Sequence, residues 1–198
     1  MKLFRYCLLG FGIFLLLTAG FIAGFLFLGK DDLPPNDEDL WLPKLEIKEK
    51  ENGYYYFNQI SEKIYQLAEQ MQPDLVDDII KGKEWDAKFV EELLAKNEEI
   101  FYYSEKILQT SQYNNPYLLN PGDVSVFTEL ISYGGLRNIA RLYSLSAELL
   151  LRDGKDEEAL AESLKIIKLG HMLEEGRNGL IGYLTGVGVR RLGMDEFR

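Results

Sequence analysis

The chain has 198 residues, of which 46% are hydrophobic, and its 22 Lys and Arg against 32 Asp and Glu give a formal net charge of −10. So acidic a chain argues against binding to nucleic acid or to anionic lipid surfaces, because both attract positive charge. The single Cys excludes an intrachain disulfide, so the fold must be held by its apolar core.

The most informative feature is an unbroken run of 24 uncharged residues, Tyr6 to Gly29, between Arg5 and Lys30. As a helix, residues 7–29 would be roughly 35 Å long, enough to cross a hydrocarbon core of about 30 Å. The alternative is a cleavable signal peptide, but the apolar region of such a peptide is typically about 7 to 15 residues long. We therefore predict a transmembrane anchor.

The orientation of this anchor depends on the Lys and Arg near its ends. The count is almost balanced, because Lys2 and Arg5 flank one end while Lys30 flanks the other and Lys44 and Lys48 follow at a distance. Because a short tail is normally left in the cytoplasm, we expect residues 1–6 to be cytoplasmic. The rest of the chain is then exterior to the cell membrane, either periplasmic or extracellular.

Within the anchor, Gly20 and Gly24 form a small-xxx-small pair that would let a second helix approach closely. This pair is a candidate homodimer contact, although glycine is also common in membrane helices that do not associate. Residues 30–50 follow, an acidic segment with prolines that favour extended backbone. We predict a linker there, leading to a domain over 51–198.

This domain is predicted to be all-α, because its apolar residues recur at helical spacing and no convincing strand alternation is found. We expect a bundle of αα-hairpins. Helices are predicted at about 52–72, 74–81, 86–110, 123–133, 136–152, 156–176 and 180–192.

Local signals define several boundaries. Gly82 is predicted to cap the end of one helix and Asp86 the start of the next, and Gly134 with Gly135 to kink or break a helix. Asn97 lies on an apolar helix face, where a polar side chain usually bonds to nearby backbone and only rarely forms a ligand site.

Two further segments carry candidate interaction residues. Tyr113 and Tyr117 lie in the longest internal loop, where they either suit a peptide contact or pin the loop across the bundle. Gly182 and Gly186 lie in the last helix, where each glycine costs about 1 kcal/mol relative to alanine, so close packing should compensate. No clear terminal cap follows this helix, which leaves open whether the natural chain continues past Arg198.

The stretch AELLLRDGKDEEALAESLKIIKLG, residues 147–170, resembles the αα-hairpin of a tetratricopeptide repeat. With Gly154 at the turn, Ala147 and Ala159 fall at the two small positions where the helices of that family touch. Ser163 stands where the family has a large residue, and no second copy follows at a spacing of about 34 residues. The layout also resembles uncharacterised bacterial single-pass membrane proteins with a helical exterior domain, which implies an architecture but no activity.

Catalytic groups are scarce. The only histidine, His171, precedes Glu174 and Glu175 on one helix face, but one His and one Cys cannot supply a zinc site. No phosphate loop, nucleophile elbow or His-Glu metal motif is present in the sequence. We therefore predict no catalytic residue, no metal and no cofactor.

These features together predict a non-enzymatic, membrane-anchored helical module for protein interaction or assembly in the cell envelope, with a protein partner and no nucleic acid. One alternative is a subunit of a membrane complex that uses the Gly-rich C-terminal helix, which would show an exposed apolar patch near residues 182–189. The other is a membrane-tethered enzyme, which would show a pocket with converging polar groups.

The dimer hypothesis for the anchor leads to a first prediction. Replacing both Gly20 and Gly24 by Leu should abolish self-association in a membrane two-hybrid assay, because two bulky side chains prevent close helix approach. An unchanged signal would contradict it.

Overall fold

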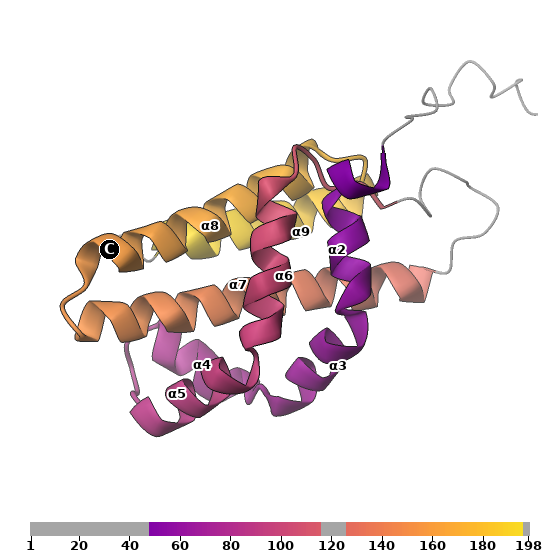
Figure 1. Ribbon diagram of the computed structural model, residues 1–198. Coiled ribbons are helices and arrows are strands. Elements are labelled where there is room, and N and C mark those ends of the chain that lie inside the picture. Colours follow the sequence, from indigo (N-terminus) through magenta and orange to yellow (C-terminus); the bar gives the residue numbers. More distant parts are fainter. Residues whose placement is uncertain (1–47, 116–125, 196–198) are drawn as a thin grey trace, which may run out of the picture. The chain divides into compact units, whose positions relative to one another are not determined.

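A computed structural model describes residues 48–115 and 126–195, and within them all regular structure is helical (Figure 1). The prediction of an all-α domain is therefore confirmed. The predicted anchor with Gly20 and Gly24, the linker up to residue 47, and Tyr117 lie outside the described residues. The helices are η2 (Glu49–Glu51), α2 (Gly53–Gln59), α3 (Ser61–Gln70), α4 (Pro73–Ile80), α5 (Ala87–Lys96), α6 (Glu98–Gln109), α7 (Val126–Arg152), α8 (Asp156–Glu175) and α9 (Gly179–Asp195).

The long helices pack as hairpins. Helices α7 and α8 are joined by a turn at Gly154, whose φ of +72° is a conformation that glycine adopts without steric cost. Helix α9 returns along α8, its most extensive partner, and also contacts α7. Helix α2 packs on α6, while α3, α4 and α5 lie against α7. Helix α7 therefore runs through the centre of the described bundle.

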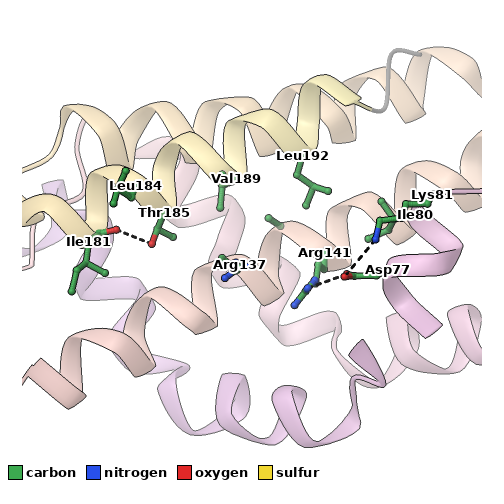
Figure 2. Close-up of a pocket in the computed structure, with 12 residues that line it drawn as sticks. Asp77, Ile80, Lys81, Arg137, Arg141, Ile181, Leu184, Thr185, Val189 and Leu192 are labelled. Carbon is green, nitrogen blue, oxygen red and sulfur yellow. Dashed lines mark hydrogen bonds and ion pairs between the residues drawn. The ribbon is translucent and has the colours of Figure 1, made fainter. Parts of the chain in front are cut away.

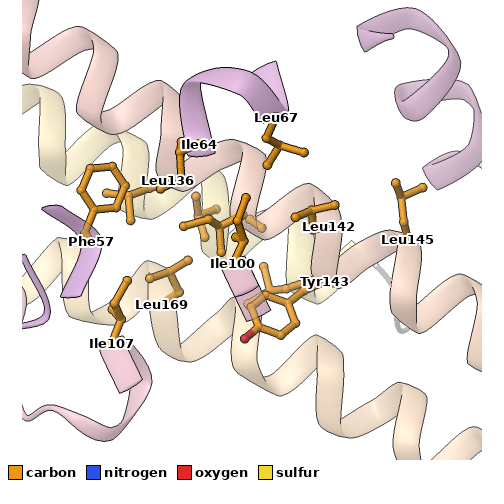
Figure 3. Packing of buried hydrophobic residues seen from close by; sticks show 14 of the residues in the cluster. Phe57, Ile64, Leu67, Ile100, Ile107, Leu136, Leu142, Tyr143, Leu145 and Leu169 are labelled. Atoms are coloured by element: carbon orange, nitrogen blue, oxygen red, sulfur yellow. The ribbon is translucent and has the colours of Figure 1, made fainter. Parts of the chain in front are cut away.

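One apolar core connects these helices (Figure 3). Phe57 and Ile64 from α2 and α3 meet Leu136 of α7, while Ile100 and Leu169 approach from α6 and α8. Each of these five side chains is at most 5% exposed. The apolar stripes expected from helical spacing thus form the interior.

Two predicted helices are each divided in two. The segment expected at 52–72 breaks at Ile60, and the one at 86–110 breaks at Asn97. The Asn97 amide donates to the Leu93 carbonyl at 2.7 Å, while its backbone N–H bonds to Leu94. In a continuous helix the Leu93 carbonyl would accept from the Asn97 backbone N–H, but here the Asn97 side chain occupies it. The break was not predicted, but the predicted bond between Asn97 and nearby backbone is confirmed.

Of the kink or break predicted at Gly134 and Gly135, the break was wrong, because α7 continues through both residues. An added Cβ at Gly135 would lie 2.5 Å from the Ile64 side chain and 3.1 Å from that of Phe57. Because Gly135 has no side chain, Phe57 of α2 and Ile64 of α3 can pack directly on the backbone of α7. The predicted caps are confirmed: Gly82 has a φ of +68°, and the Asp86 carboxylate accepts from Phe89 N–H at 3.0 Å.

Helices α8 and α9 touch backbone to backbone, as the glycine pattern predicts. An added Cβ at Gly186 would lie 2.7 Å from the Gly170 carbonyl oxygen, and one at Gly170 would lie 2.5 Å from Arg190 N. Farther along, a Cβ at Gly193 would lie 2.9 Å from the Ser163 carbonyl oxygen. No side chain larger than hydrogen fits at these crossings unless the helices separate.

The buried side chain of Asn178, between α8 and α9, ties together three distant segments. Its amide donates to the carbonyls of Tyr113 at 2.8 Å and Leu173 at 3.2 Å, and its oxygen accepts from Asn115 N–H at 3.1 Å. Its own backbone carbonyl accepts from the Tyr133 hydroxyl at 2.7 Å. The turn is thereby fixed to the segment after α6 and to α7.

Two more asparagines extend this arrangement. Asn52, the N-cap of α2, donates to the Asn114 carbonyl at 2.8 Å and accepts from Asn114 N–H at 2.9 Å. The Asn114 side chain in turn accepts from Arg177 N–H at 2.7 Å. We call Asn52, Asn114 and Asn178 the asparagine clasp, since it joins the start of α2, the segment after α6 and the α8–α9 turn.

The α8–α9 contact predicts opposite effects for two glycines of one helix. Gly186→Ala should destabilise the fold by about 1 to 3 kcal/mol, because the new methyl group meets backbone atoms that cannot move alone. Gly188→Ala should stabilise it by up to about 1 kcal/mol, because alanine favours helix and a Cβ there meets nothing within 4 Å. Chemical denaturation followed by circular dichroism measures both, and equal effects would contradict the packing.

Candidate functional site

A groove of about 570 Å³ lies between α4, α7 and α9 (Figure 2). Helix α9 supplies most of its apolar wall, including Ile181, Leu184, Val189 and Leu192, and Ile80 of α4 adds to it. These α9 residues lie on the helix face next to the one whose glycines contact α8. Helix α9 therefore packs on α8 with one face and lines the groove with the neighbouring face.

The opposite side of the groove is basic. Arg141 of α7 donates to the Asp77 carboxylate at 2.9 Å, and Lys81 lies 4.0 Å from the other oxygen of the same group. Arg137, one helical turn before Arg141, is exposed and makes no hydrogen bond or ion pair within the described residues. The lining thus carries three cations and one anion in a chain whose net charge is −10.

Large apolar side chains are exposed on α9, and one of them, Leu184, lines the groove. Leu180 is 72% exposed, Leu184 58% and Tyr183 49%. By contrast, Thr185 in the wall donates its hydroxyl to the Ile181 carbonyl at 2.9 Å, so this polar group is already satisfied. An exposed apolar row next to a groove is typical of surfaces that bind a partner.

The residues singled out from the sequence have other positions. Tyr113 is fully buried and packs edge-on against the rings of Tyr54 and Phe57. Gly182 and Gly186 are also buried: a Cβ at Gly182 would lie 2.8 Å from the Tyr133 hydroxyl, and Gly186 contacts α8. The structure thus brings the two glycines close to the groove, but on the packed face of α9.

Arg137 and Arg141 were not identified from the sequence. Their only signal was two arginines four residues apart within the otherwise apolar stretch that follows Gly135. The opposing α4 and α9 residues lie about 60 positions before and about 40 after them, so no local pattern could have brought these groups together.

The histidine considered for acid–base chemistry is on the surface. The Nε2 of His171 lies 3.3 Å from Glu175, and both side chains are more than half exposed. Glu174 instead accepts from Arg190 Nε at 2.7 Å, which links α8 to α9. Within the described residues, no group of three or more His, Cys, Asp or Glu could hold a metal ion.

The densest ionic cluster joins α6, α7 and α8. Lys165 lies 2.6 Å from Glu105 and 2.9 Å from Glu162, and the Tyr143 hydroxyl donates to Glu105 at 3.3 Å. Burial raises the pKa of Tyr143, and the charge of Glu105 adds to it. Burial lowers the pKa of Lys165, but its bonds to Glu105 and Glu162 outweigh this, so that pKa is raised. Both groups stay protonated near neutral pH, which suits a structural cluster and not a base or nucleophile.

No protein-family model matches the chain, and comparisons with curated proteins and with solved structures find no match. None of the helices in the described part of the chain is both long enough and apolar enough to span a membrane. The predicted anchor lies outside that part.

The ionic cluster predicts a pH-dependent stability. Lys165→Met should cost about 1 to 3 kcal/mol at neutral pH, because Glu162, with 16% of its side chain exposed, loses its partner. Since the pKa of Lys165 is raised in the fold, its stabilising effect is complete below the ordinary lysine value of 10.5 and disappears as the pH rises through the higher folded value. The deficit of the variant should therefore shrink in strongly alkaline solution.

Urea denaturation across this pH range provides the measurement. Lys168→Met is the matched control, because Lys168 is on the same helix, exposed and without an ion pair in the described residues. It should change stability by less than about 0.5 kcal/mol. Equal losses in the two variants would contradict the structural role of the cluster.

Proposed function

We propose that this chain is a membrane-anchored helical module that binds a protein partner in the cell envelope, and that the groove between α4, α7 and α9 is the binding site. The observation that carries the proposal is the combination of an apolar wall, a basic side and one largely exposed leucine, Leu184, in the lining. Protein interfaces characteristically combine an apolar centre with a polar rim, and arginine is enriched at their strongest contacts.

The chemistry of the groove favours binding over catalysis. Its ionisable lining groups are Asp77, Lys81, Arg137 and Arg141, and Asp77 is already shared by two cations. Among the described residues, the lining contains no Ser, Cys or His to act as a nucleophile with its base. Such a groove can attract and orient a ligand through its charges.

Two features of the sequence support the remaining parts of the proposal. The apolar run Tyr6–Gly29 suits a single membrane span, which would keep the module at the envelope. The α7–α8 hairpin supports a tetratricopeptide-like character, since Ala147 and Ala159 are both almost fully buried. Proteins with such helical hairpins commonly present binding surfaces to other proteins.

The exposed row on α9 also favours the related possibility that the partner belongs to a membrane complex. Leu180, Tyr183 and Leu184 are apolar side chains that a stable subunit interface would cover. Both versions use the same surface and differ in how permanently it is occupied.

Site-specific photocrosslinking in native membranes tests this proposal. A photoreactive phenylalanine at position 184 should give a discrete protein adduct, because this side chain projects at the edge of the groove. Position 164 is the control: Leu164 on α8 is 52% exposed and does not line the groove. Equal adducts at both positions, or none at 184, would contradict the assignment of this surface.

A further inference from the structure

From the charges and shape of the groove between α4, α7 and α9, we infer that its partner presents an acidic amphipathic helix. This inference rests on the proposed function and specifies the chemistry of the partner. It depends on three properties of the described residues: the distribution of charge, the spacing of apolar side chains along α9, and the hydrogen bonding of the surrounding backbone.

The charge argument starts from Asp77, the one carboxylate among the described residues of the lining. It lies 2.9 Å from Arg141 and 4.0 Å from Lys81, so its negative charge is already shared by two cations. Arg137 remains exposed and without an ion pair in the described part of the chain. This local excess of positive charge favours a ligand with carboxylates.

The shape argument concerns α9. Its lining residues run from Ile181 to Leu192, a rise of about 16 Å, at steps of three and four positions. Gly188 lies within this row, and a Cβ there would meet nothing within 4 Å, so a partner can approach the α9 backbone closely. A helix of about three turns matches this length and would pack its own apolar stripe along the row.

The backbone argument favours a helix over an extended peptide. The groove is walled by α4, α7 and α9, whose mid-helix N–H and carbonyl groups are bonded within each helix. An extended ligand would therefore find no sheet edge to pair with and would lose hydrogen bonds to water. A helix satisfies its own backbone and needs only complementary side chains.

The positions of the charged and the apolar lining residues determine which flank of the bound helix is acidic and which is apolar. The cations project from α7 and α4, whereas most of the apolar side chains come from α9 (Figure 2). A bound helix must then place Asp or Glu along one flank and Leu-like side chains along the other. An anionic lipid headgroup would satisfy the charges as well, but it presents no helical stripe of apolar side chains to match the row along α9.

Fluorescence anisotropy with the full-length chain in detergent tests the inference. The probe is a labelled synthetic helix of about 16 residues with Leu at helical spacing and Glu along one flank, and its counterpart has Lys in place of every Glu. The Glu peptide should bind, and the Lys peptide should bind at least about fivefold more weakly. Vesicles of phosphatidylglycerol serve as the lipid probe.

Two pairs of variants locate the binding. Arg137→Glu should weaken binding of the Glu peptide about fivefold, since the attraction between Arg137 and the peptide carboxylates becomes a repulsion of similar size. Its control is Lys168→Glu, which reverses an exposed charge outside the groove. Leu184→Asp should also weaken binding, whereas Leu164→Asp, at a comparably exposed leucine of α8, should not.

Each other outcome overturns the inference. It fails if the Lys peptide binds as well as the Glu peptide, if neither binds, if the controls weaken binding as much as the groove variants, or if only lipid vesicles bind in an Arg137-dependent way. The proposed function fails separately: an adduct at position 184 with no binding of the Glu peptide would indicate a protein partner of different chemistry, whereas no adduct would remove the protein-binding role itself.

Discussion

The described fold depends on the asparagine clasp. The side chain of Asn52 bonds to the backbone of Asn114, that of Asn114 to the backbone N–H of Arg177, and that of Asn178 to the backbone on either side of Asn114. These bonds fix the start of α2, the chain after α6 and the α8–α9 turn at one place. Asn114 and Asn178 are almost fully buried, so losing one of these side chains would leave backbone groups without partners, at about 1 to 3 kcal/mol for each. Hydrophobic burial has no direction, whereas these bonds set where α9 begins. The groove exists because α9 starts there and runs back along α8.

The glycines of α8 and α9 act on the same helix from its other face. Gly170 and Gly186 allow backbone contact, so α9 is held mainly by a narrow strip against α8. A helix packed through glycines buries few of its large side chains, and Leu180 and Leu184 consequently remain exposed. The glycine pattern of α9 therefore has two results: close packing against α8 on one face and an exposed apolar row on another. The clasp sets the position of α9, and the glycines set its separation from α8.

The sequence was a good guide to most features that a local interaction determines, although it missed the helix break that the Asn97 side chain causes. The caps at Gly82 and Asp86 and the glycine contact of the last helix could be predicted, because each depends on one residue or one helix face. The unbroken course of α7 could not, because the role of Gly135 depends on Ile64, about 70 positions earlier. The groove was missed for the same reason. Its charged side joins residues of α4 and α7 that are about 60 positions apart, and no periodicity connects them.

Attachment to a membrane by the predicted anchor would compensate for the low affinity expected of the groove. A groove with a short apolar row and one arginine that is unpaired within the described residues offers few strong contacts, and exposed charge pairs contribute only about 0.2 to 1 kcal/mol each. Such a surface binds weakly when both partners are free in solution. When both are held at one membrane, the encounter takes place at an effective concentration that reaches the millimolar range for short tethers. A modest groove then suffices, and the basic side would serve mainly to select the partner and its orientation, since charge complementarity contributes more to specificity than to affinity. The small, amphipathic character of this site is thus what a tethered binding module requires.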